Sequence, residues 1–191
     1  MSGGRRAFLV LVIAVSLSGL VSAAQEAPAK GFRAEFLADW DDFAKKCVSL
    51  AEAMPAEKYT WRPNADVRSV SEIYLHMVQG NYFYTQMLGA QSPAGLDLRA
   101  LEKSTTDKAK IVDLLKQSFE QVRRTALATS DADLDKAVKM FNRDSTARNG
   151  FYTIGTHQHE HFGLCIAYAR TCNVVPPWTA ARQAVQPPKK Q

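Results

Sequence analysis

The sequence predicts an all-α protein folded as a four-helix bundle. Four segments carry apolar residues at three- and four-residue spacing, which is the pattern of a helix with one buried face. They span residues 32–54, 70–88, 104–130 and 151–171. We find no internal repeat and no alternation of apolar and polar residues, so no strand is expected. A chain of 191 residues, of which 46% are hydrophobic, is long enough to bury one core of this kind.

The first two helices have clear ends. Pro55 stops the first helix, and Ser69 with Glu72 forms a capping box that opens the second. The expected inner face of the second helix consists of Val70, Ile73, His76 or Met77, Gly80, Phe83 and Met87. Gly80 lies one turn after His76 and leaves open space on that face.

The third helix begins in the polar run 104–107 and ends near Ser130. Residues 131–139 are expected to add a short helical turn, and residues 140–150 to form a polar loop. Asn173, Pro176 and Pro177 stop the fourth helix. Because the connections are long, the helices need not alternate simply up and down. The expected divisions of the chain are a signal peptide (1–24), a lead (25–31), the bundle (32–178) and a flexible tail (179–191).

The N-terminal residues have the features of a cleaved export signal. Arg5 and Arg6 precede an apolar run over residues 8–20, and small residues near Ala23 offer cleavage points. The run is short for a membrane span. We therefore expect a bacterial protein that is periplasmic or extracellular, without a stable membrane anchor once the signal is removed. A retained anchor is the alternative, and the export route stays open.

The charge gives little indication of partners. Removal of Arg5 and Arg6 lowers the formal net charge from +5 to +3, and part of the remainder lies in Lys189 and Lys190. A nucleic-acid-binding protein needs a clustered basic face, so we expect no nucleic-acid partner. A small-molecule substrate is expected instead, and a homodimer is among the allowed states.

Three cysteines would remain after export: Cys47, Cys165 and Cys172. Cys165 and Cys172 lie seven residues apart on one helix, roughly 10 Å along its axis, so they cannot bridge each other. Cys47 could pair with either one in an oxidising compartment. Cys47 also fits the apolar stripe of its own helix, so a buried free thiol is the simpler interpretation.

Three of the four histidines fall within five residues of the fourth helix. His157 and His161 share its apolar stripe one turn apart, so both imidazoles can reach one metal ion at about 2.0–2.1 Å. His76 lies on or beside the buried face of the second helix. Three histidines are a common ligand set of open catalytic metal sites. The sequence therefore predicts a divalent metal held by His76, His157 and His161, with hydrogen-bonded structural histidines as the alternative.

Two carboxylates are candidates to support this centre, Glu72 and Glu160. The capping box already explains Glu72, and an exposed helix position explains Glu160. His159 points to the opposite side of the helix and is expected at the surface. The catalytic residues stay unassigned, because the chain has no Gly-x-Ser-x-Gly elbow, no phosphate-binding glycine loop and no His-Glu-x-x-His motif.

Taken in order, several short motifs make the chain resemble the DinB-like (DinB/YfiT) metal-binding bundles. The similarity covers about residues 32–177 and rests on 50–55, 59–63, 67–72, His76, His157, 160–163, 168–170 and 175–177. The resemblance implies a bundle with up-down-down-up helix order. It also implies a divalent metal, often zinc or nickel, with ligands that correspond to His76, His157 and His161. The chain departs from the family pattern at Leu164, where many members have Gln or Asn, and at Ala169, the usual position of a leucine.

Three functions are consistent with this sequence. The first is a metal-dependent hydrolase, because three neutral ligands leave coordination positions open. The second, implied only by the resemblance, is a transferase that uses a low-molecular-weight thiol. The third is an exported module without catalysis that binds a metal or a small molecule. Imidazole ligands alone allow zinc, nickel, iron or copper.

Overall fold

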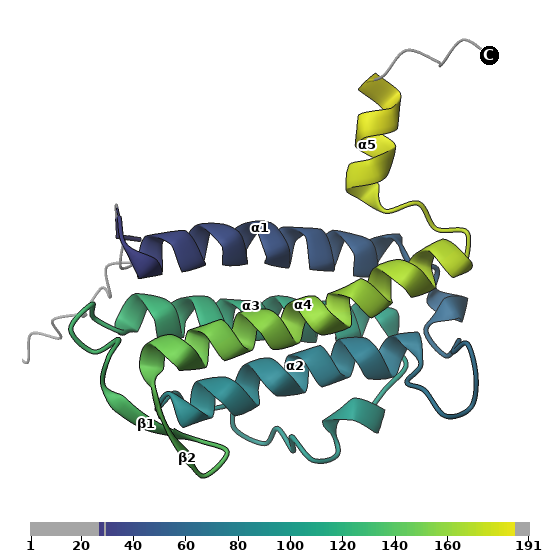
Figure 1. The fold of residues 1–191 in the computed structure, drawn as a ribbon. Coiled ribbons are helices and arrows are strands. Elements are labelled where there is room, and N and C mark those ends of the chain that lie inside the picture. Colours follow the sequence, from purple (N-terminus) through teal and green to yellow (C-terminus); the bar gives the residue numbers. More distant parts are fainter. Residues whose placement is uncertain (1–26, 29, 186–191) are drawn as a thin grey trace, which may run out of the picture.

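The computed structural model describes residues 27–28 and 30–185, and four long helices form the predicted bundle (Figure 1). The elements in order are α1 (Phe32–Ala53), the 3-10 turn η1 (Ala56–Lys58), α2 (Val70–Met87), the 3-10 turn η2 (Leu101–Lys103), α3 (Lys108–Ala128), β1 (Ala137–Met140), β2 (Arg143–Thr146), α4 (Ala147–Thr171) and α5 (Pro177–Val185). The expected signal peptide over residues 1–24 lies outside the described residues.

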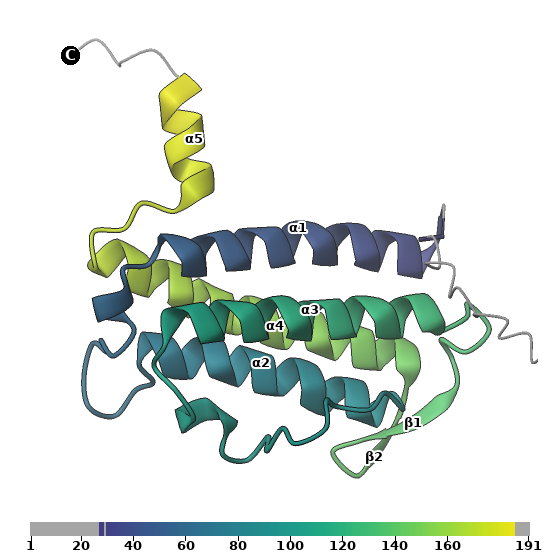
Figure 2. The ribbon, with the colours of Figure 1, turned by 180° about the vertical axis from the view of Figure 1, so that it is seen from behind.

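The helix order is up-down-down-up, as expected. The sequence colours show that α1 and α4 run in one direction and α2 and α3 in the other (Figures 1 and 2). Helices α2 and α3 pack side by side although they are parallel, so the chain between them must return along the bundle. The connection over residues 88–107 makes this return, which explains its length. Helix α4 packs against both α1 and α2.

Local signals in the sequence set the helix ends. The capping box at Ser69 is present: its hydroxyl accepts a hydrogen bond from the backbone N–H of Glu72, whose carboxylate accepts from the backbone N–H of Ser69. Asp107 caps α3 and Thr146 caps α4 in the same way, through side-chain oxygens. Among the described helices, none combines the length and the apolarity that a membrane span requires.

Aromatic side chains from three helices form the centre of the core. Trp40 and Phe43 of α1 pack against Phe119 of α3, with ring centroids 5.4 and 5.7 Å apart. Phe162 of α4 closes the cluster at 5.3 Å from Phe43. The indole N–H of Trp40 donates to the carbonyl of Phe119 at 3.1 Å, so this buried polar group is satisfied. The cluster therefore holds α1, α3 and α4 in register.

The segment before α4 contains a β-hairpin, so the prediction of a polar loop at 140–150 was wrong, and the turn predicted within 131–139 is confined to the hydrogen-bonded turns of residues 130–136. Strands β1 and β2 are antiparallel, and Met140 pairs with Arg143, which leaves a two-residue turn of Phe141 and Asn142. Both turn residues have positive φ, 51° and 62°. Thr146 at the end of β2 caps α4, so this helix starts one turn earlier than expected.

Two further expectations differ from the structure. Phe83, assigned to the inner face of α2, is 40% exposed, because α2 turns this position toward solvent beside the hairpin. Residues Pro177–Val185 form helix α5 mostly within the region expected as a flexible tail, and residues 186–191 of that region lie outside the described residues. Helix α5 projects from the end of the bundle (Figure 1), and Trp178 contacts Phe162 at its base, with ring centroids 5.7 Å apart.

Candidate metal centre

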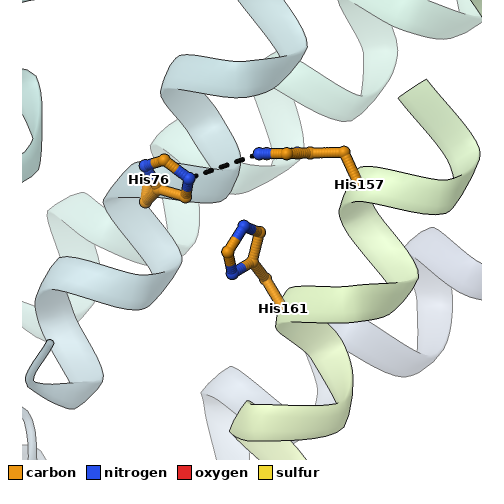
Figure 3. Close-up of side chains that lie close together, drawn as sticks. All are labelled: His76, His157 and His161. Atoms are coloured by element: carbon orange, nitrogen blue, oxygen red, sulfur yellow. Dashed lines mark hydrogen bonds between the residues drawn. The ribbon is translucent and has the colours of Figure 1, made fainter. Parts of the chain in front are cut away.

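His76, His157 and His161 meet between α2 and α4 (Figure 3). One ring nitrogen from each residue lies within 4.8 Å of the others. The ring centroids of His76 and His157 are 5.1 Å apart, and that of His161 lies 4.5 Å from each of them. The structure therefore brings together the three histidines that the sequence singled out. His159 is exposed and packs on Phe43, away from the other three.

The spacing of the ring nitrogens fits a metal ion. The Nε2 atoms of His76 and His157 lie 3.2 Å apart. Two nitrogens bound to one tetrahedral zinc ion are separated by about 3.3 Å, given bonds of about 2.0–2.1 Å. A metal ion between the three rings would take one lone pair from each neutral imidazole, and for His76 and His157 that nitrogen is Nε2. The Nδ1 atoms of His157 and His161 are buried and have no hydrogen-bond partner.

The surroundings keep the three imidazoles neutral. Burial, with the positive charges that His161 and His76 would carry, lowers the pKa of His157 to about 3. Burial is also the main cause that lowers the pKa of His76 and of His161. Neutral imidazole is the form that binds metals, so the site is prepared for a cation near neutral pH.

Glu102 is a functional residue that the sequence reasoning missed. Its carboxylate accepts a hydrogen bond from Nδ1 of His76 at 3.1 Å and another from Nε of Arg68 at 2.8 Å. A carboxylate that accepts from one ring nitrogen leaves the lone pair of the other nitrogen directed into the site. Glu102 lies in η2, within the long connection, and Gln79 of α2 fixes that connection by donating to the carbonyl of Leu98 at 2.7 Å. No periodicity or motif in residues 88–107 signals this contact.

The two carboxylates proposed from the sequence lie in different places. Glu72 is held in the capping box and by Arg62 at 3.1 Å, which lowers its pKa and leaves it away from the histidine rings. Glu160 is exposed on α4, next to His161. Burial is the main cause that raises the pKa of Tyr84, and the negative charge of Glu160 raises it further. The same charge partly offsets the lowering of the pKa of His161. Glu160 thus lies near the centre, at its solvent side.

Gly80 provides the room that His157 occupies. A Cβ atom at position 80 would lie 2.5 Å from Cε1 and 2.9 Å from Nδ1 of His157. Contacts this short do not occur between real atoms, so only glycine allows the imidazole to lie directly on α2. The open space expected at Gly80 is therefore filled by a histidine ring.

The three cysteines are free thiols. Cys47 and Cys165 are buried, and burial raises the pKa of both thiols. Cys172 is partly exposed near the end of α4. None of the three belongs to the histidine cluster.

Comparison with known proteins identifies relatives of this fold. A family model described as the DinB superfamily matches residues 39–165, which is more than half of the chain. The chain is also similar to the crystal structure of a DinB-like protein from Bacillus cereus, with a TM-score of 0.66 and 15% identity over 74% of this chain and 93% of that one. At this identity the likeness shows the fold alone. No curated protein gives a significant match.

Proposed function

This chain belongs to the DinB superfamily, and from that premise we propose that it is an exported protein that binds one divalent metal ion and hydrolyses a small-molecule substrate. The ligands are His76, His157 and His161. The observation that carries the proposal is the convergence of one ring nitrogen from each histidine within 4.8 Å of the others, with two Nε2 atoms 3.2 Å apart. Imidazole ligands accept several divalent ions, and the family resemblance favours zinc or nickel among them.

A divalent ion held by the three histidines would supply Lewis acidity and acidify water, because three protein ligands leave a position for water or substrate. The residues of the chain do the remaining work. Glu102 orients His76 through its hydrogen bond at 3.1 Å, and Gly80 leaves room for the ring of His157. Glu160, at the solvent side of the centre, is placed to accept a proton from water.

Export is proposed on the sequence alone. The arginine pair, the apolar run and the small residues within residues 1–24 support a cleaved signal. Neither the small net charge nor its distribution favours a nucleic-acid partner, so a small molecule is the proposed ligand. A membrane anchor after cleavage is not part of the proposal.

A non-catalytic binding module is the second candidate. It is favoured because most carboxylates near the histidines already have hydrogen-bond or ion-pair partners and are not free to act as a base. Glu102 is occupied by His76 and Arg68, and Glu72 by its cap and Arg62. Within the described residues, this leaves Glu160 as the carboxylate near the histidines without a hydrogen-bonded partner. A hydrolase therefore depends on Glu160, whereas a binding module does not.

The first test is metal content by elemental analysis of untagged protein purified without chelator, together with His76→Ala and His157→Ala. We expect about one ion per chain, lost in both variants. Wild-type protein that stays metal-free after reconstitution with zinc and nickel would contradict the proposal. The loaded protein is then assayed on ester, amide and phosphate substrates beside Glu160→Gln. Metal binding without any hydrolysis would favour the binding module.

A further inference from the structure

Three aromatic side chains form a continuous surface that leads from solvent to His157. We call Phe83 and Tyr84 of α2 and Phe141 of the hairpin the aromatic wall. The ring of Phe141 lies 5.9 Å from Phe83 and 5.8 Å from Tyr84, measured between centroids. Tyr84 in turn lies 5.1 Å from the ring of His157. The hairpin turn, distant from α2 in sequence, is thus placed against the α2 side chains that adjoin His157.

Two members of the aromatic wall are open to solvent. Phe83 is 40% exposed and Phe141 is 51% exposed, while Tyr84 is buried between them and the histidine. Leu164 of α4, one turn after His161 on the same helix face, is 44% exposed. Six large hydrophobic side chains are exposed in the described part of the chain, and two of the six, Phe83 and Phe141, pack on Tyr84 beside His157. Exposed apolar surface concentrated in this way marks a binding surface.

Neither the turn nor the core explains Phe141. Both residues of the turn have positive φ, which favours asparagine or glycine, and Asn142 meets this preference. Phe141 at φ 51° does not, because a bulky side chain with positive φ strains the backbone. Phe141 is also 51% exposed, so about half of its surface contributes nothing to the burial of apolar area. A strained residue that is also exposed beside a candidate active centre is typical of a side chain kept for ligand contact.

We propose that the aromatic wall binds an aryl group of the ligand, while the polar end of the same ligand reaches the metal at the histidines. The substrate class is then an aromatic or arylalkyl ester, amide or acid derivative. An aryl group would stack on the exposed rings of Phe83 and Phe141, in the offset or edge-to-face geometry that aromatic rings prefer. The inference rests on the proposed metal site, and it deepens that proposal by naming the substrate class.

The test uses two hydroxamates that differ only in the group under question. Acetohydroxamate and benzohydroxamate both chelate metals, but only the second carries an aryl group. Each is titrated into cobalt(II)-loaded protein, and the visible absorption of the cobalt reports binding. We expect wild-type protein to bind benzohydroxamate about tenfold more tightly. Phe141→Gly should reduce this preference about three- to tenfold and leave the affinity for acetohydroxamate unchanged.

The variants separate ligand contact from folding. Glycine and asparagine both accept positive φ, so both Phe141→Gly and Phe141→Asn should stay folded; in Phe141→Gly the relief of backbone strain opposes the greater entropy of glycine in the unfolded chain. Tyr152→Ala is the matched control, because Tyr152 is 66% exposed on α4 and lines the side that faces α1. We expect this control to keep the full preference for benzohydroxamate.

Four outcomes would overturn the inference. If cobalt-treated wild-type protein showed no cobalt absorption, both the metal site and the aryl-binding role of the aromatic wall would be ruled out. If cobalt bound but the two hydroxamates had equal affinity, only the aryl-binding role of the aromatic wall would be ruled out. A preference for benzohydroxamate that Phe141→Gly leaves intact would have the same meaning. If Phe141→Gly instead turned a dimer into a monomer in light scattering without changing hydroxamate binding, the wall would be assigned to a second copy of the chain.

Discussion

The Nδ1 atom of His76 lies 3.1 Å from a carboxylate oxygen of Glu102, although the two residues are 26 positions apart in the chain. Because a carboxylate accepts and does not donate, the ring N–H of His76 points at Glu102. The lone pair of Nε2 then faces His157, 3.2 Å away. Arg68 fixes the other oxygen of Glu102 at 2.8 Å. The 3-10 turn η2 therefore determines the tautomer of a candidate metal ligand.

Glu102→Gln should weaken metal binding about 10- to 100-fold, the usual effect of losing a carboxylate that supports a histidine ligand. An amide can donate to Nδ1 as well as accept from it, so the tautomer of His76 is no longer fixed. Competition with a chelator of known affinity measures the change. Glu120→Gln, at an exposed position of α3, is the control and should leave the affinity unchanged. Equal affinities for the two variants would mean that Glu102 does not orient His76.

Gly80→Ala should disturb both the fold and the site. The added methyl group would lie 2.5 Å from the ring of His157, so α2 and α4 must separate or the ring must move. Overpacking of this kind costs about 1–3 kcal/mol, and the displaced ring should weaken metal binding. Thermal melts and chelator competition measure the two effects.

Gly155→Ala is the matched control for Gly80→Ala. Gly155 lies on the same helix as His157, and a Cβ atom there would meet no atom within 4 Å. Because alanine favours the helix, this variant should be unchanged or up to about 1 kcal/mol more stable, with normal metal binding. If both alanine variants behaved alike, the close contact of Gly80 with His157 would have no role.

The bundle was predictable because its helices follow one period. Trp40, Phe43 and Cys47 recur at three- and four-residue spacing on α1, and all three are buried. The hairpin was not predictable, because each strand has only four residues and the turn contains no glycine. Lys139, Arg143 and Asp144 are charged and exposed, so no alternation of apolar and polar residues stands out.

In the site, too, the residues on periodic helices were predictable and those on irregular segments were not. His157 and His161 share a helix face by spacing alone, and the apolar stripe of α2 placed His76 near the core. Glu102 reaches His76 through a connection whose path depends on tertiary contacts, such as the burial of Leu101. Contacts made by non-periodic segments have no local pattern, so sequence reasoning could not find this carboxylate or the aromatic wall.

Mild acid should destabilise the metal-free protein. The pKa of His157 is lowered to about 3, and those of His76 and His161 are also lowered, whereas histidines in the unfolded chain titrate near 6.5. Below pH 6.5 the unfolded chain binds protons that the native state does not. The contribution of the neutral histidines to the free energy of unfolding is therefore fully present above about pH 6.5 and is lost as the pH falls toward 3.

Urea unfolding of chelator-treated protein between pH 7.5 and 5 measures this acid effect. Few carboxylates titrate in that range, so the histidines dominate the change in midpoint. We expect the urea midpoint to fall with pH in wild type and to fall less steeply in His157→Gln. A wild-type midpoint that stays constant over this range would show that the imidazoles are not held neutral by the fold.

The thiols should differ in reactivity in the folded protein. Cys47 and Cys165 are buried with raised pKa values, so neither access nor thiolate formation favours their reaction. Cys172 is partly exposed. Ellman's reagent should therefore titrate one thiol per native chain rapidly and all three in denaturant, without prior reduction. Cys172→Ser should abolish the rapid phase and leave two thiols in denaturant. Only one thiol in denatured wild type would instead reveal a disulfide, and Cys47 with Cys165 would be the pair to test, because both lie in the same buried core.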